Sequence, residues 1–282
     1  ENSGSPSEGN SGTFNMYGGI ISGNTAENGG GVYLNDGTFN MYDGTIGGNT
    51  AENGGGVYVE KGTFIMYGGS ISNNKAQSGG GVYMFNDKDG PIPQFAMYDG
   101  TIIGNEAAYD GGGVFAGTGS ILMLRGNVAA ITGNTSNRNG GGVHVAGGQF
   151  IMDNGTLSGN EAKSGGGVYI EKGAFAMSGS ISGNEAQYGG GVAAVGGTFT
   201  VYGGAISGNT AANTGGGVYV DSDNSATFTV AGGKILNNTK GSAGASNVYA
   251  VGGAPFKVEN SLPDTTEIYV DHGIGAVFTN GG

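Results

Sequence analysis

The sequence predicts an all-β fold, a right-handed single-stranded parallel β-helix (solenoid) of about nine coils, each of about 25 residues with three short strands. Two observations predict this fold. The tetrapeptide GGGV recurs along the chain at a nearly constant spacing, and apolar residues alternate in the same positions after each copy. A fixed period of this length is typical of stacked repeat proteins, in which each unit packs only on its neighbours.

The valines that end the GGGV copies measure the length of one repeat. They are Val32, Val57, Val82, Val114, Val143, Val168, Val192 and Val218, and a degenerate copy ends at Val248. Successive GGGV copies are 24 to 26 residues apart, except for intervals of 32 and 29 residues before and after Val114. A unit of this size cannot bury its own apolar face, so we expect the copies to stack.

Each repeat contains three apolar segments separated by glycine-rich steps. In one repeat Val57 and Val59 form the first segment, Phe64 and Met66 form the second, and Ile71 anchors the third. Alternation with period two is typical of strands, and Gly-Gly steps interrupt any helical pattern. We therefore predict three strands and three corners in each coil. Each strand pairs in parallel with its equivalent about 4.8 Å away, and the preference of parallel crossovers for one hand makes the helix right-handed.

Three columns of equivalent residues are predicted to fill the interior. The aromatic column is Phe14, Phe39, Phe64, Phe95, Phe150, Phe175, Phe199, Phe228 and Phe256. The column beside it is Met16, Met41, Met66, Met97, Met152 and Met177, continued by Val201, Val230 and Val258. The third column is Asn24, Asn49, Asn74, Asn105, Asn134, Asn160, Asn184, Asn209 and Asn238. Asn tolerates corner geometry and bonds to its own copy in the next coil, so we interpret this column as a structural ladder.

The whole chain, residues 1–282, is predicted to be one β-helix domain. Residues 1–11 form a polar lead-in that does not resemble a signal peptide, and residues 12–251 form the repeats. Residues 252–282 are irregular, with Pro263 interrupting the pattern, and we expect them to cap the last open edge. The polar start suggests a mature form or a part of a larger exported protein.

Composition narrows the classes of partner. The chain has 10 Lys and Arg against 22 Asp and Glu, which gives a net charge of −12. Phosphate backbones require a basic patch, so we expect no nucleic-acid partner, and no apolar run is long enough for a membrane helix. Cys is absent, which excludes thiolate metal sites and Cys nucleophiles. We expect neither a cofactor nor a metal, and a monomer when the domain is isolated.

The repeat ISGNTAENGGGVY (Ile21–Tyr33) resembles the repeat of the chlamydial-type polymorphic outer-membrane proteins. The shared elements are an apolar-x-x-Asn element, here Ile21 with Asn24, and a Gly-Gly-apolar element that ends at Val32. The longer unit from Gly37 to Tyr58 is similar to the pectin-lyase-like β-helix repeats of large bacterial surface proteins. This resemblance extends over nearly the whole chain, from about Gly12 to Val251. It implies exposure at the bacterial cell surface, with adhesion as the commonest role.

Function remains open between three classes of protein. We expect a secreted or cell-surface adhesin-like module for a glycan or a partner protein, and the alternatives are a passive stalk and a carbohydrate-active enzyme. An enzyme would need clustered carboxylates. Asp43 and Asp99 occupy equivalent positions, but Gly68 lies between them, so their backbones should be about 10 Å apart. His144 is expected to be an exposed surface residue, and His272 lies in the irregular tail. We therefore predict that the chain is not an enzyme.

Outward tyrosines and two insertions point to a ligand site. One outward column contains Tyr33, Tyr58, Tyr83, Phe115, His144, Tyr169, Ala193, Tyr219 and Tyr249, and another contains Tyr17, Tyr42, Tyr67 and Tyr98, then Asp153, Ser178 and Tyr202. The insertions, residues 86–93 and 125–130, should border the second strands from opposite sides. We predict a shallow groove lined by Tyr42, Tyr67, Tyr98, Asp87, Asp89, Asp99 and Arg125. The alternatives are tyrosines that only stack on their own copies and neutral length variation.

Overall fold

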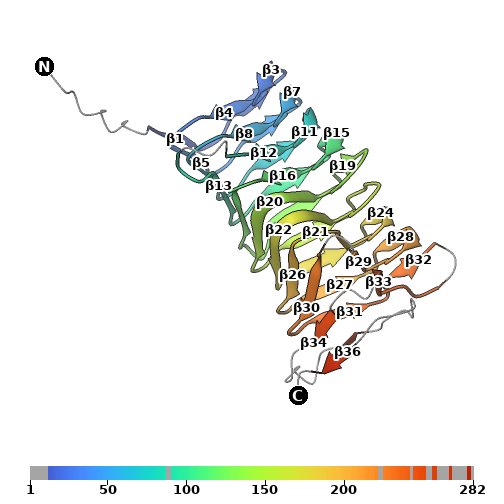
Figure 1. Ribbon diagram of the computed structural model, residues 1–282. Coiled ribbons are helices and arrows are strands. Elements are labelled where there is room, and N and C mark those ends of the chain that lie inside the picture. The colour runs from blue at the N-terminus through green and yellow to red at the C-terminus, as the bar shows by residue number, and fades with distance from the viewer. Residues whose placement is uncertain are drawn as a thin grey trace, which may run out of the picture.

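A computed structural model of the chain describes residues 12–86, 90–221, 225–241, 244–251, 256–258, 267–268 and 278–280. The predictions made for Asp87, Asp89 and His272 lie outside these residues. The described part of the chain is all-β, without a helix, and forms a parallel β-solenoid of about nine turns. Figure 1 shows the coils stacked from the first repeat, in blue, to the last, in red. The predicted fold class is therefore confirmed.

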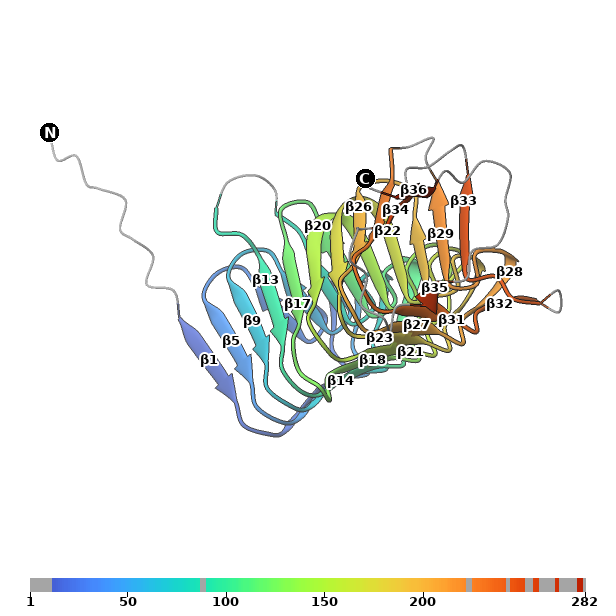
Figure 2. The ribbon, with the colours of Figure 1, turned by 90° about the horizontal axis from the view of Figure 1, so that it is seen from below.

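The first and second strands of the coils belong to one sheet, which has 18 strands among the described residues. The first strands are β4 (Val32–Leu34), β8 (Val57–Val59), β12 (Val82–Met84), β16 (Val114–Gly117), β25 (Val192–Ala194), β29 (Val218–Asp221) and β33 (Val248–Val251). The second strands are β1 (Thr13–Met16), β5 (Thr38–Met41), β9 (Thr63–Met66), β13 (Gln94–Met97), β17 (Ile121–Leu124), β26 (Thr198–Val201), β30 (Thr227–Val230), β34 (Phe256–Val258) and β36 (Phe278–Asn280). In two coils the pair is continuous, as β20 (Val143–Met152) and β22 (Val168–Met177). Figure 2 shows several second strands side by side on one face.

The third strands form a separate parallel sheet. They are β2 (Ile20–Ser22), β6 (Thr45–Gly47), β10 (Ser70–Ser72), β14 (Thr101–Ile103), β18 (Ala130–Thr132), β21 (Thr156–Ser158), β23 (Ser180–Ser182), β27 (Ala205–Ser207), β31 (Lys234–Leu236) and β35 (Glu267–Ile268). Each of the three-residue strands from β2 to β31 has one central side chain that points inward, such as Ile71 or Ile181, and both of these are fully buried. The three apolar segments of the repeat thus form strands, as the alternation predicts.

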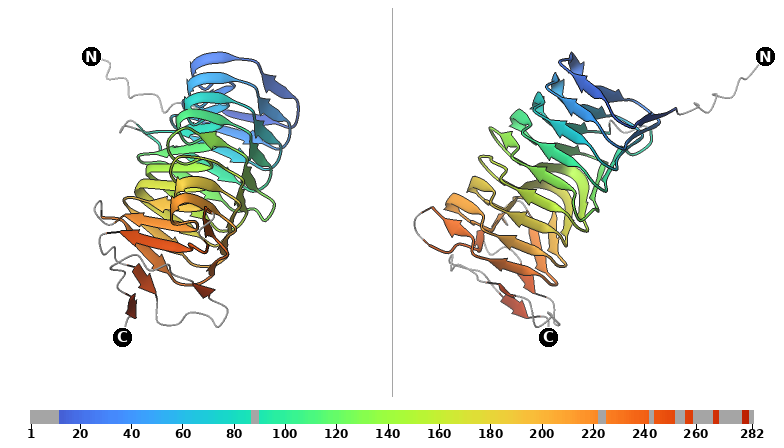
Figure 3. Two further views of the ribbon diagram at one scale, coloured as in Figure 1. Left: turned by 90° about the vertical axis from the view of Figure 1, so that its right-hand side faces the viewer. Right: turned by 180° about the vertical axis from the view of Figure 1, so that it is seen from behind.

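The structure adds a fourth short strand between the Asn and the glycine triplet in most coils. These strands are β3 (Thr25–Asn28), β7 (Thr50–Asn53), β11 (Lys75–Ser78), β15 (Glu106–Asp110), β19 (Thr135–Ser136), β24 (Glu185–Tyr188), β28 (Thr210–Thr214) and β32 (Thr239–Lys240). These fourth strands form two parallel sheets, of five and of three strands among the described residues. Isolated bridges at Glu161 and Ser164 connect the two sheets. Figure 3 shows the stacked coils from two further sides.

The interior contains the predicted columns as far as Phe228 and Val230, and the side chains of Phe256 and Val258 lie outside the described part. Phe39 pairs with Phe64 and Phe64 pairs with Phe95 in register, and these rings are buried. Two details differ from the prediction. Phe14 is 57% exposed, because it lies in the first described coil and, within the described ranges, only the coil of Phe39 packs against it. Leu122 and Leu124 take the places of Phe and Met in the coil after Phe95, a coil that the predicted columns passed over.

The Asn column is a continuous hydrogen-bonded ladder, as predicted. From Asn49 to Asn238 each side chain is fully buried. The Oδ1 atom of Asn105 accepts bonds from both the backbone N–H and the Nδ2 of Asn74, at 3.0 and 2.9 Å. Its Nδ2 donates to Asn134 Oδ1 and to the carbonyl of Ile71. The side-chain amide is therefore fully satisfied, which is what burial of a polar group requires.

The glycine triplets bring the fourth strand of one coil close to the first strand that follows it. Gly165 has a φ of +65°, and a Cβ there would lie 2.4 Å from the carbonyl oxygen of Val168. A Cβ on Gly166 would lie 2.5 Å from the carbonyl oxygen of Glu185 in the next coil. Only glycine permits this tight reversal. We call the outer surface between the ends of the fourth strands and the first strands the outer corner.

Candidate functional site

The predicted tyrosines after the second strands form one regular stack. The ring centroids of Tyr17, Tyr42, Tyr67 and Tyr98 are 4.8, 4.9 and 5.5 Å apart in order, and the planes differ by 11° or less. We call these four residues the tyrosine column. Because the rings stack face to face, solvent meets their edges and hydroxyls. A sugar therefore has no open ring face to stack on along the interior of this column.

Arg125 continues the tyrosine column and does not stand apart in an inserted corner. Its backbone N–H donates to the carbonyl of Met97, as that of Tyr98 donates to the carbonyl of Met66. Arg125 is therefore the next rung, and Asp153 follows it. Arg125 Nε lies 3.7 Å from Asp153 Oδ2, so a cation and an anion end the run of phenol rings. The structure thus brings Tyr67, Tyr98 and Arg125 together, as the predicted site requires.

Asp43 and Asp99, at the corner that follows the second strands, accept hydrogen bonds from backbone N–H groups. Asp99 Oδ1 accepts a bond from the N–H of Gly100 at 2.5 Å, and Asp43 Oδ1 accepts one from Gly44 at 2.7 Å. Both side chains are exposed. A local bond of this kind is a common reason for Asp at a turn. Asp99 thus lies one residue after the tyrosine column, with its carboxylate engaged in its own corner.

The two insertions flank the second strands at opposite ends. Residues 86–93 lie between β12 and β13, and the insertion predicted as residues 125–130 lies between β17 and β18, except that Ala130 already begins β18. These positions agree with the predicted placement. Asp87 and Asp89, which were expected to form part of one wall, lie outside the residues that the structure describes.

A second aromatic column runs along the first strands, at the outer corner. Tyr58, Tyr83 and Phe115 stack at centroid distances of 5.2 and 4.7 Å. The register continues through His144 and Tyr169 to Ala193, where the aromatic side chain is missing, and then to Tyr219 and Tyr249. We call this series the corner column.

His144 is buried, and the prediction of an exposed residue is wrong. It is 3% exposed and packs edge-on between Phe115 and Tyr169, at centroid distances of 5.0 Å each. The cause is the outer corner, which places Asp110 from the end of β15 over the ring. His144 Nδ1 lies 3.7 Å from Asp110 Oδ1, and Nε2 lies 3.4 Å from Glu171 Oε2.

Charged groups surround His144 on both sides. Arg138 Nη2 lies 3.6 Å from Asp110 Oδ2, and the guanidinium lies over the ring of Tyr109 at 5.2 Å. The contact with His144 lowers the pKa of Glu171, although burial acts in the opposite direction. Neither ring nitrogen of His144 has a well-aligned hydrogen bond within the described part of the chain. Its burial makes a general acid–base role unfavourable, since no substrate could reach the ring without a rearrangement.

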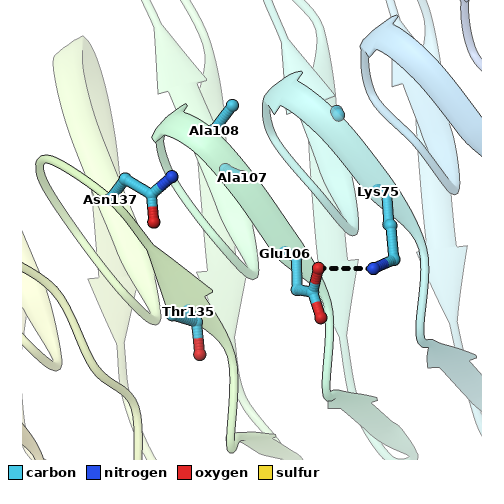
Figure 4. Close-up of a pocket in the computed structure, with 7 residues that line it drawn as sticks. Lys75, Glu106, Ala107, Ala108, Thr135 and Asn137 are labelled. Atoms are coloured by element: carbon cyan, nitrogen blue, oxygen red, sulfur yellow. Dashed lines mark hydrogen bonds and ion pairs between the residues drawn. The ribbon is translucent and has the colours of Figure 1, made fainter.

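A shallow hollow of about 290 Å³ lies on the face of the fourth strands (Figure 4). Ala76, Ala107 and Ala108 contribute to its lining, and Lys75 and Glu106 form an ion pair of 2.7 Å at one side. Both charged side chains are more than half exposed, so the pair adds little stability. Among the described residues, no group of three or more His, Cys, Asp or Glu could hold a metal ion.

The fold and its outer columns define a parallel β-solenoid with aromatic side chains on its outside. Comparison of the chain with protein-family models, with curated proteins and with solved structures finds no match. No helix in the described ranges is long and apolar enough to cross a membrane.

Proposed function

We propose that the chain is an adhesin-like binding module that contacts a glycan through the tyrosine column. The observation that carries this proposal is a regular row of partly exposed phenols on a rigid sheet, ended by Arg125 and Asp153. Each phenol hydroxyl both donates and accepts hydrogen bonds, and each ring edge is apolar. Tyrosine offers such contacts at a low cost in conformational entropy.

The stacking geometry defines how the glycan lies. Since the ring faces cover one another, contact is made through hydroxyls and ring edges, and a glycan chain runs along the rod so that successive sugars meet successive rungs. Arg125 supplies a donor fork at the end of the row. A partner protein is the other ligand class for this face and is an outcome of the test below.

The proposed location is the surface of a bacterial cell, within a larger exported protein. Its support is the resemblance of the repeat Ile21–Tyr33 to the repeats of the polymorphic outer-membrane proteins and to pectin-lyase-like repeats of bacterial surface proteins. The net charge of −12 is consistent with a ligand other than nucleic acid.

A passive stalk is the second candidate. The observation in its favour is that the tyrosine rings already stack on one another and cover their faces, as cross-strand aromatic pairs do in sheets without a ligand. An enzyme has less support, because the carboxylates of Asp43 and Asp99 each serve a local turn.

The experiment measures binding of the chain to a panel of immobilised glycans by biolayer interferometry. The double variant Y67A/Y98A removes two adjacent rungs, and Y109A is the control, since Tyr109 is exposed to a similar degree (45% against 41% and 42%) on another face. We expect the double variant to bind at least about tenfold more weakly, equivalent to about 1.4 kcal/mol, and Y109A to bind like the parent. Unchanged affinity of Y67A/Y98A refutes this site. Binding to no glycan supports the stalk or a protein-directed adhesin.

A further inference from the structure

The corner column has one vacant rung. Ala193 pairs in register with Tyr169 in one neighbouring coil and with Tyr219 in the other. The backbones of these two tyrosines are therefore two strand spacings, about 10 Å, apart. In the rest of the column from Tyr33 to Tyr249, each rung carries an aromatic ring or an imidazole. The regular stack therefore lacks one ring here, and Ala193 itself is fully buried, so the surrounding side chains cover its methyl group.

A second departure from the repeat occurs in the same coil. Tyr188 ends β24 at a position where the neighbouring coils carry Ser164 and Thr214. Its ring lies 5.7 Å from that of Tyr219, with the planes at 57°. Tyr188, from the end of the fourth strand, therefore lies next to Tyr219 and close to Ala193 of the following first strand.

Together these changes produce a small hollow with aromatic walls. Its volume is about 160 Å³, and the residues that line it include Tyr169, Tyr188 and Tyr219, with the buried Ala193 at its base. Polar groups come from Ser164 and Asp221. This volume is below the range of roughly 300–1,000 Å³ for drug-sized ligands, so it suits one small group and not an oligosaccharide.

The electrostatic environment of the hollow is negative. Burial is the main cause that raises the pKa of Tyr169 to about 12, and the nearby carboxylates of Glu171, Asp110 and Asp221 act in the same direction. Carboxylates that disfavour the tyrosinate anion also disfavour an anionic ligand and favour a cation. Aromatic faces attract cations in the same sense, most strongly when the cation is weakly hydrated and partly desolvated.

We propose that this hollow binds a quaternary ammonium group, which Tyr169, Tyr188 and Tyr219 contact with their rings and which the carboxylate of Asp221 attracts. The ligand class is a trimethylammonium head group, as in a choline ester or a trimethylated lysine. This site is on a different part of the surface from the tyrosine column, so it stands or falls independently of the glycan proposal.

The test is isothermal titration of the full chain with choline and with its neutral isostere, in which a tert-butyl group replaces the trimethylammonium group. We expect a dissociation constant for choline in the millimolar range and at least about tenfold weaker binding of the isostere. Equal affinities overturn the proposal, since the hollow would then be only apolar. Absence of choline binding also overturns it. A peptide with trimethyllysine, titrated in parallel, identifies which carrier of the head group the site prefers.

Variants locate the binding. Tyr188 lies at the surface, so Tyr188→Ala should fold normally and weaken choline binding about tenfold. Ala193→Phe restores the missing ring and should abolish binding, with Tyr109→Ala as the control that retains it. If choline binds the Tyr188→Ala chain as tightly as the parent, the cation is held elsewhere and the proposal is wrong, whether or not the Ala193 variant folds.

Discussion

The Asn ladder offers the most direct test of what holds the coils together. Asn160 lies at its centre and is fully buried. Its Oδ1 accepts bonds from the backbone N–H and the Nδ2 of Asn134, and its Nδ2 donates to the carbonyl of Ile131 and to Asn184 Oδ1, all at 2.9 to 3.0 Å. The substitution Asn160→Ala removes all four bonds without altering the backbone chemistry.

The magnitude follows from these contacts. A hydrogen bond within a protein contributes about 1 kcal/mol net, and a buried group left without a partner costs about 1–3 kcal/mol. Loss of four bonds should therefore lower the free energy of unfolding by about 4 kcal/mol. Asn160→Asp keeps the two accepted bonds but places an acceptor against the carbonyl of Ile131, so it should be at least as destabilising at neutral pH.

The assay is urea unfolding followed by circular dichroism, together with native-state hydrogen exchange. A solenoid can unfold a few coils at a time. The hydrogen-exchange rate of the Asn134 backbone amide, which donates to Asn160, therefore reports the local loss of stability. The control is Asn40→Ala, which breaks one exposed side-chain bond to Asn15 and should change stability by less than about 0.5 kcal/mol. A cost below about 1 kcal/mol for Asn160→Ala would refute the reasoning, because the ladder would then be incidental to stability.

Three further predictions concern the corners and the titrating groups. Gly166→Ala should cost several kcal/mol in urea unfolding, because its Cβ would lie 2.5 Å from a backbone oxygen, whereas Gly203→Ala, with its nearest atoms 3.7 Å away, should be tolerated; equal effects would contradict the corner geometry. The raised pKa of Tyr169 means that its contribution to stability is complete below pH 10 and is lost as pH rises through about 12, so Tyr169→Phe should remove a tyrosinate that forms near pH 12 in a spectrophotometric titration and flatten the alkaline loss of stability. The lowered pKa of Glu171 means that its contribution is present above pH 4.5 and is lost as pH falls through the folded value; His144→Phe should remove this acid limb from the dependence of Tm on pH, and an unchanged acid limb would show that the contact has no energetic effect.

The interior could be predicted from the sequence because it depends on one period. Val57, Phe64 and Ile71 recur in each unit, and alternation alone assigns them to inward positions. The fourth strand could not be found in this way. Residues 50–53, for example, have only Ala51 inward, and one small side chain among polar ones does not produce an apolar pattern.

The outer surface was less predictable, because it depends on contacts between coils. Arg125 was assigned to an insertion since Leu122 and Leu124 hid the coil to which it belongs. His144 was expected to be exposed because alternation places it outward, whereas Asp110 from another coil covers it. The vacancy at Ala193 was visible in the sequence, but nothing in the period indicates that another tyrosine reaches toward it from β24.

We propose that this chain binds a ligand on its outer face and leaves that ligand intact. The most direct measurement incubates the purified chain with each glycan that it binds and follows the release of reducing ends over time. We expect saturable binding with no new reducing ends above a control without protein. Cleavage would contradict it and would assign catalysis to groups such as Asp43 and Asp99, whose carboxylates are here interpreted as parts of turns.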